Sequence, residues 1–196
     1  MPLPDNHVGA ALKAAQAQRE HAPLHLTIEQ ARILQDSLEL EAATMLGRIL
    51  FAFGEFERDI SLCAVWSRSG ADFDALKHKI ASANFDTKIS EIRGSVHSIF
   101  RAGTLERIAY DEWIERVDGV RLIRNKLAHG RWWFDPYGNQ VVHILGIPGS
   151  PDQTETRHTI SGMTAFLKLI RALQAELNQL QSKHNLSKAW ELAHFK

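Results

Sequence analysis

Cysteine is nearly absent from this chain of 196 residues, and other features that define protein classes are missing as well. The single cysteine, Cys63, cannot form a disulfide framework or a Cys-rich metal site within one chain. Its neighbours are apolar, so we expect it to be a small core residue. No apolar run approaches the ~20 residues of a membrane-spanning helix, and the N-terminus lacks the pattern of a signal peptide. We therefore expect a soluble, cytoplasmic protein without membrane contact.

Net charge is also absent, because 23 Lys and Arg residues balance 23 Asp and Glu residues. Proteins that bind nucleic acid non-specifically usually carry a basic excess, so any site for a polyanion must be local here. Such an excess occurs between Ile114 and Trp133, where five basic residues stand against two acidic ones. A solvated helix face gives the same count, so the basic excess is consistent with either a polyanion site or a solvated face.

Common catalytic and metal-binding signatures are absent too. The chain has no Gly-rich phosphate loop, no His-Glu-x-x-His and no Gly-x-Ser-x-Gly. His78 and His97 lie on polar or mixed helix faces without acidic partners at metal-ligand spacing, and His143 is equally consistent with a hydrogen-bonded core histidine or a surface one. We therefore expect no metal and no cofactor.

Apolar residues repeat in steps of three and four along most of the chain, which is typical of amphipathic helices. A capping box at Thr27 and Gln30 precedes the longest repeat, which lasts about ten turns. That repeat consists of Leu38, Ala42, Met45, Ile49, Phe53, Phe56, Ile60 and Cys63. Ser69-Gly70 is expected to end this helix, and further helices are expected over about 72–80, 89–100, 104–129, 163–180 and 186–195. The 104–129 repeat uses Ile108, Trp113, Val117, Val120 and Leu127.

Between two of these helices the pattern becomes that of strands. Trp132, Trp133 and Phe134 lead into a turn at 135–138, and residues 141–145 and 154–160 follow as strands. Successive strand residues face opposite sides, so one of the two tryptophans should pack inward. The sequence predicts an all-α fold of four to five helices with a small β-hairpin or three-stranded insertion at 131–160. We expect a loosely ordered arm over 1–26, one helical domain over 27–184 and a tail over 185–196.

The string Arg124-Asn125-x-x-x-His129-Gly130 closes the helix before this insertion. Gly130 stands where a left-handed cap belongs, which places His129 in the last turn and Arg124 in the turn before it. A guanidinium, an amide and an imidazole can hold a phosphodiester, stabilise its charge and move a proton. On a regular helix Arg124 and His129 lie about 140° apart, so a site requires a loosened last turn, a long reach or a second copy of the helix.

The same residues have a purely structural interpretation as well. An arginine in a late turn can pair with a carboxylate, and an asparagine can bond to a loop. A histidine near a helix C-terminus is favoured by the helix dipole.

An Arg-polar-x-x-x-His motif that ends a helix in a small helical domain resembles the HEPN superfamily. The segment Phe53-Gly54-Glu55-Phe56-Glu57 and the aromatic hairpin after Gly130 resemble bacterial HEPN-like proteins, over roughly residues 38 to 180. The resemblance implies a homodimeric, metal-independent endoribonuclease with a composite site. It also implies RNA as a partner, a toxin or phage-defence role, and a cognate antitoxin protein.

The resemblance also implies roles for individual residues. Arg124 would stabilise the phosphorane, Asn125 would orient the phosphate or the histidine, and His129 would act as general base or acid. Arg121, Lys126, Arg131 and Glu57 are the candidate substrate-binding residues, although Glu57 paired with Arg58 or a nearby lysine is the alternative. Some family members have lost catalysis, so the alternative function is a silent interaction or dimerisation module. The zero net charge and the β insertion depart from a generic basic ribonuclease.

Overall fold

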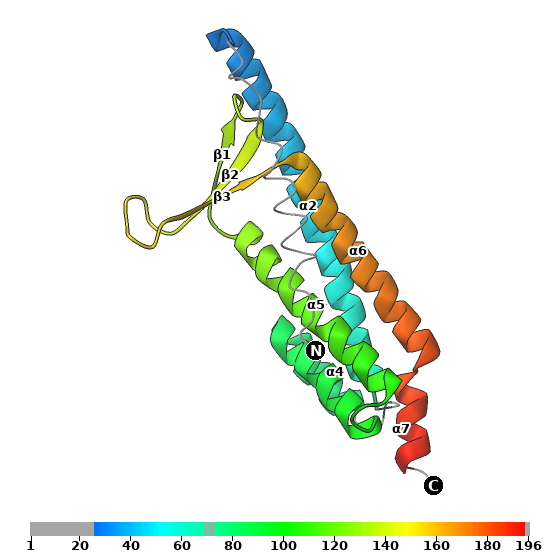
Figure 1. The fold of residues 1–196 in the computed structure, drawn as a ribbon. Helices are drawn as coiled ribbons and strands as arrows, with labels where there is room; N and C mark the ends of the chain where they lie inside the picture. Colours follow the sequence, from blue (N-terminus) through cyan, green and yellow to red (C-terminus); the bar gives the residue numbers. More distant parts are fainter. Residues whose placement is uncertain (1–25, 69, 71–72, 195–196) are drawn as a thin grey trace. The chain divides into compact units, whose positions relative to one another are not determined.

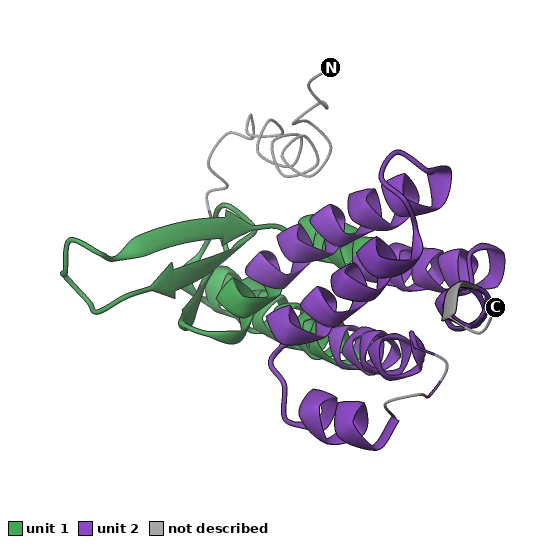
Figure 2. Ribbon diagram, turned by 90° about the horizontal axis from the view of Figure 1, so that it is seen from below, with its two compact units in different colours: residues 1–51, 124–169 green, residues 52–123, 170–196 purple. Residues whose placement is uncertain are grey.

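A computed structural model describes residues 26–68, 70 and 73–194 of the chain. Of these residues, 72% are helical, and a three-stranded antiparallel sheet provides further regular structure. The chain divides into two compact units, which Figure 2 shows in different colours. Unit 1 contains the described residues up to Phe51 together with Arg124–Leu169, and unit 2 contains Ala52–Ile123 and the described residues from Ile170 onward. The expected arm falls almost wholly outside the described residues.

Helix α2 (Ile28–Trp66) contributes a segment to each unit (Figure 1). Its start is the expected capping box: the Thr27 N–H donates to Gln30 Oε1 at 2.9 Å, and the Gln30 N–H donates to Thr27 Oγ1 at 3.2 Å. These bonds satisfy backbone donors at the start of the helix, where the first N–H groups lack an intrahelical partner. Every apolar residue of the expected stripe, from Leu38 to Cys63, is buried, which confirms the helix and its inward face.

Unit 1 combines the first part of α2 with the last residues of α5 (Leu105–Ala128), the sheet and the first part of α6 (Ile160–Lys183). The strands are β1 (Arg131–Asp135), β2 (Gln140–Leu145) and β3 (Thr154–His158), in the order β1-β2-β3 (Figure 1). The three-stranded form of the insertion is therefore the one observed. In the register, Trp132 pairs with His143 and Val141 pairs with His158. Paired residues and residues two apart share a face, so Trp132, His143 and His158 lie on the same face of the sheet.

The turn between β1 and β2 lies at the expected place and is held by Asp135. Asp135 Oδ1 accepts hydrogen bonds from the backbone N–H groups of Tyr137 and Gly138, both at 3.1 Å. Arg157 Nη1 of β3 donates to Asp135 Oδ2, also at 3.1 Å. One carboxylate therefore organises the turn and ties it to the third strand.

Unit 2 contains the remaining parts of α2, α5 and α6 together with α3 (Phe73–Ala81), α4 (Phe85–Ile99) and α7 (Leu186–His194). Trp113 is fully buried there, and its Nε1–H donates to the Leu173 carbonyl at 2.9 Å. Phe56 packs edge-on against Trp113, with ring centroids 6.1 Å apart. A buried tryptophan needs a partner for its N–H, and this arrangement supplies one from α6.

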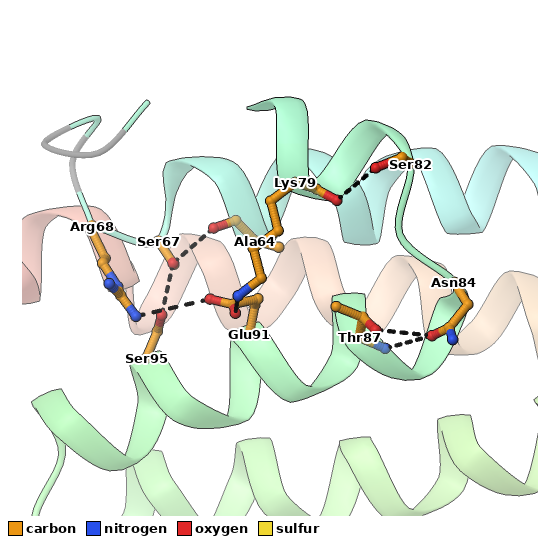
Figure 3. Close-up of polar contacts among 9 residues, drawn as sticks. All are labelled: Ala64, Ser67, Arg68, Lys79, Ser82, Asn84, Thr87, Glu91 and Ser95. Carbon is orange, nitrogen blue, oxygen red and sulfur yellow. Dashed lines mark hydrogen bonds and ion pairs between the residues drawn. The ribbon is translucent and has the colours of Figure 1, made fainter. Parts of the chain in front are cut away.

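Hydrogen bonds join the end of α2 to α4 within unit 2 (Figure 3). Ser67 and Ser95 are buried, and their hydroxyl oxygens lie 2.8 Å apart. Ser67 donates to the Ala64 carbonyl at 2.9 Å, so Ser95 is the donor to Ser67. Asn84 caps α4, because its Oδ1 accepts from the Thr87 N–H at 2.9 Å.

Cys63 is buried, as expected, and it also takes part in a partly buried polar network in unit 2. Gln181 Nε2 donates to Cys63 Sγ at 2.8 Å and to the Tyr110 hydroxyl at 3.1 Å. The Tyr110 hydroxyl in turn donates to the His184 carbonyl at 3.1 Å. Burial raises the pKa of the Cys63 thiol to about 12, and burial together with Cys63 raises the pKa of Tyr110. Both groups therefore stay neutral near neutral pH.

Several expected boundaries differ from those observed. Helix α5 ends at Ala128, so His129 follows the helix and does not belong to its last turn. Ile108 is 43% exposed, because the step of five residues to Trp113 turns a helix by about 140°. Helix α2 ends at Trp66, and the expected positions Ser69 and Asp72 lie outside the described residues. None of the helices in the described part of the chain is long and apolar enough to cross a membrane.

Candidate functional site

His129 combines a restrained backbone with an open side chain. Its N–H donates to the Lys126 carbonyl at 3.2 Å, and its own carbonyl accepts a hydrogen bond from His143 Nε2. The imidazole is exposed, and it makes no hydrogen bond or ion pair with the residues that the structure describes. The bond to Lys126 spans three residues, so the chain leaves α5 through a tighter turn than a regular α-helix. A ring held in this way is available to an external molecule.

Gly130 adopts the expected left-handed conformation directly after His129, with φ at +102°. A Cβ atom at this position would lie 2.6 Å from the Ile144 carbonyl oxygen and 2.7 Å from His143 Nε2. Glycine is therefore required both by the backbone conformation and by the close approach of β2.

His143 connects the sheet to the end of α5. It is 2% exposed, and its ring centroid lies 4.4 Å from that of Trp132. A carbonyl oxygen only accepts hydrogen bonds, so the hydrogen on the His143 ring that faces His129 is on Nε2. His143 is thus a hydrogen-bonded core histidine, one of the two interpretations that the sequence left open.

His158 completes an aromatic cluster with Trp132 and His143. Its ring centroid lies 6.0 Å from that of Trp132 and 6.2 Å from that of His143. Burial, and to a smaller extent the neighbouring His143, lowers the pKa of His158 to about 4. His158 is therefore neutral at neutral pH.

The two tryptophans of β1 diverge as expected. Trp132 is partly buried and takes His143 and His158 of the sheet as its aromatic neighbours. Trp133 faces the opposite side and is 51% exposed.

Arg124 and Asn125 lie together in the final turns of α5. Arg124 Nη1 donates to Asn125 Oδ1 at 3.1 Å, and both side chains are partly buried. Lys126 and Arg131 are exposed, and Arg131 Nη2 donates to the Gly146 carbonyl at 3.4 Å. Together with His129, these four residues are the candidate site residues that unit 1 contains.

The remaining two candidates, Arg121 and Glu57, belong to unit 2 and form ion pairs there. Arg121 Nε lies 3.0 Å from Asp86 Oδ1. Glu57 Oε1 accepts from Lys88 Nζ at 2.7 Å, and the Lys88 side chain is only 11% exposed. A buried lysine requires a counter-charge, so Glu57 has a structural role. Its partner is a lysine of another helix, whereas the expected alternative partner Arg58 pairs with Asp59.

Sequence reasoning missed two histidine contacts. His97 Nε2 lies 2.8 Å from Asp111 Oδ1 of the next helix, a partner that spacing within one segment cannot reveal. The hydrogen bond from His143 to the His129 carbonyl was not predicted, because the two histidines are fourteen residues apart in the sequence. With the turn at 136–139, the strand pairing places His143 opposite Trp132, and Trp132 follows His129 by only three residues.

No group of three or more His, Cys, Asp or Glu side chains that could hold a metal ion occurs within the described ranges.

Replacement of Gly130 by alanine should strongly destabilise unit 1. The left-handed conformation costs roughly 1–2 kcal/mol for a non-glycine residue, and the forced contacts add about 1–3 kcal/mol. Urea unfolding of Gly130→Ala should therefore show a loss of about 2–5 kcal/mol in unfolding free energy. Gly94→Ala is the matched control, since a Cβ at Gly94 in α4 meets no atom within 4 Å. Equal stability of the two variants would contradict the geometry at Gly130.

The His158 pKa predicts a loss of stability in acid. The pKa in the folded protein, about 4, lies below the ordinary value of 6.5, so the unfolded chain takes up the proton first as the pH falls. The stabilisation is complete above pH 6.5 and is lost progressively between pH 6.5 and pH 4, by at most about 3 kcal/mol. Urea unfolding at pH 7 and pH 4.5 should detect this loss, and His158→Phe should reduce it. A wild type and variant with parallel pH profiles would argue against a buried neutral His158.

No protein-family model, curated protein or solved structure matches this chain. Its functional assignment therefore depends on the chemistry of the residues at the end of α5.

Proposed function

We propose that this protein is a metal-independent endoribonuclease of HEPN type that acts at a groove between two copies of the chain. The observation that carries the proposal is the contrast between the backbone and the side chain of His129. Its backbone is hydrogen-bonded on both sides, whereas its imidazole is exposed and makes no bond within the described residues. Arg124 and Asn125 precede it in the final turns of α5. An imidazole used only for structure would be expected to make at least one contact in the fold.

Cleavage of RNA by its own 2′-hydroxyl requires two proton transfers. In the proposed reaction, a neutral His129 removes the 2′-hydroxyl proton, and the oxygen attacks the adjacent phosphorus. A protonated His129 of the second copy gives its proton to the 5′-oxygen as the P–O5′ bond breaks. The products are a 2′,3′-cyclic phosphate and a 5′-hydroxyl. One imidazole cannot be both neutral and protonated at the same moment, which is why the site needs a second copy.

The other motif residues supply binding and charge stabilisation in this proposal. The guanidinium of Arg124 neutralises the charge that builds on the phosphorane, and the amide of Asn125 orients the phosphate. The exposed cations of Lys126 and Arg131 bind neighbouring phosphates. Trp133 lies on the same face of β1 as Arg131, and its exposed ring can stack on an unpaired base.

A second copy of the chain has a suitable surface in unit 1. Ile33, Leu40 and Phe51 of α2 are 58%, 70% and 80% exposed, although all three are large and apolar. Their spacing of seven and eleven residues places them on one side of the helix, opposite the buried stripe. Exposed apolar side chains that share a face mark protein interaction surfaces. We assign this face to the homodimer.

The motif also implies a fold family and a biological role. In this proposal, the helices form a HEPN-like bundle with the sheet as an insertion, and the protein acts as a toxin or phage-defence effector with a cognate antitoxin. The support is the position of the motif at the end of a helix directly before an aromatic hairpin.

Purified protein should cleave single-stranded RNA in the presence of EDTA and leave 2′,3′-cyclic phosphate ends. His129→Ala and Arg124→Ala should each lower the rate by about 10²–10⁴-fold, because each removes a group that acts on the transition state. Product ends can be read by phosphatase sensitivity and mass spectrometry, and thermal unfolding of each variant should match wild type. His78→Ala, which removes an exposed histidine of α3, is the matched control. A protein without His129-dependent cleavage would instead fit the silent dimerisation module.

Light scattering or sedimentation at micromolar concentration should report about twice the 22.1 kDa mass of one chain. Leu40→Glu and Phe51→Glu place charges on the proposed interface, so each should give a monomer that has lost cleavage. Glu39→Lys also changes an exposed charge, but it lies about 100° around the helix and should leave the dimer intact. A wild type that is monomeric over this concentration range would rule out the composite site.

A further inference from the structure

We propose that His143 is a positioning residue that sets the direction of the His129 side chain, in addition to its place in the core. This proposal rests on the proposed function of His129. His143 touches no substrate in this arrangement, and it acts through the single hydrogen bond from its Nε2–H to the His129 carbonyl.

The hydrogen bond fixes one of the two peptide units that decide where the Cα–Cβ bond of His129 points. The last carbonyls of a helix lack intrahelical partners and can rotate toward any donor or water. Here the His129 carbonyl is fixed by His143, while the His129 N–H is fixed by Lys126. With the peptide bonds on both sides oriented, the Cα–Cβ bond of His129 has one direction relative to Arg124 and Asn125.

His143 is itself well placed to act as a fixed reference point. It lies in the central strand, where it pairs with Trp132 on one side and with Thr156 on the other. Its ring is buried and packed against the Trp132 ring. Gly130 allows the contact, because a Cβ there would lie 2.7 Å from His143 Nε2. The rigidity of the sheet is thereby transmitted to the backbone of His129.

Positioning and simple stabilisation predict different results. If His143 only stabilised the fold, its replacement would lower the melting temperature and leave the activity of the folded protein unchanged. If it positions His129, the folded variant binds RNA but reacts slowly, since a displacement of about 1 Å at a reacting group costs up to about 100-fold in rate.

Two substitutions of His143 separate these cases. His143→Phe keeps an aromatic ring but removes the donor, and it should lower kcat by about 10–100-fold with a KM within about threefold of wild type. His143→Gln places an amide N–H near the position of Nε2 and should recover most of this loss. Val142→Ala is the matched control, because it removes a buried side chain from the opposite face of the same strand and leaves the hydrogen bond intact. It should lower the melting temperature while kcat stays near wild type.

Nuclear magnetic resonance gives a readout that does not depend on cleavage. In wild type, the Nε2–H proton of His143 should be visible and exchange slowly with water, and the His129 ring should give one sharp set of signals. In His143→Phe, the His129 ring signals should shift or broaden, while in Val142→Ala they should not. The proposal is overturned if the wild-type His143 proton exchanges rapidly, or if His143→Phe leaves both kcat and the His129 signals unchanged. It is also overturned if Val142→Ala slows cleavage as much as His143→Phe.

The two proposals fail in distinguishable ways. A wild type that cleaves no RNA refutes the ribonuclease assignment, yet the His143 proton and the His129 signals still report whether His143 orients His129. A wild type with His129-dependent cleavage and unaltered His143→Phe kinetics refutes only the positioning role.

Discussion

The buried stripe of α2 is the constraint on which both units depend, because each unit takes part of this helix for its core. The stripe residues Leu38, Ala42, Met45 and Ile49 are buried in unit 1, and the stripe residues Phe53, Phe56, Ile60 and Cys63 are buried in unit 2. A helix of 39 residues cannot draw its stability from helix propensity alone, since most helical stability in proteins comes from packing of the apolar face. The stripe therefore fixes the rotation of α2 about its axis. That rotation turns Leu40 and Phe51 to the outside of the helix, where both are largely exposed.

Features that follow from local physical chemistry could be predicted from the sequence. The steps of three and four in α2 identify its inward face, because burial follows the 3.6-residue period directly. Thr27 and Gln30 mark the start of α2 through their side-chain chemistry, and Asp135 and Gly138 mark the hairpin turn in the same way. Gly130 identifies the end of α5, because few other residues adopt its backbone conformation.

Features that depend on tertiary partners could not be predicted in this way. A periodic pattern tells which side of a helix is buried, but it does not tell which charge on another helix meets a given residue. The pairing of Glu57 with Lys88, thirty-one residues away, is one example. The hydrogen bond from His143 to the His129 carbonyl is another, and it needed the register of the hairpin as well as its existence. The expected place of Ile108 in the apolar stripe was wrong for a different reason, because the step of five residues to Trp113 does not belong to a helical stripe.

The glycine of the motif is as informative as its arginine and histidine. A left-handed residue at position 130 turns the chain from α5 into β1, and the missing side chain lets the His143 ring and the Ile144 carbonyl approach the helix end. The same approach occupies the His129 carbonyl and leaves the imidazole open. Any larger residue at position 130 would displace β2 and release the peptide that carries His129. The string Arg-Asn-x-x-x-His-Gly therefore contains both a guanidinium, an amide and an imidazole and the glycine turn that holds the backbone of the histidine in place.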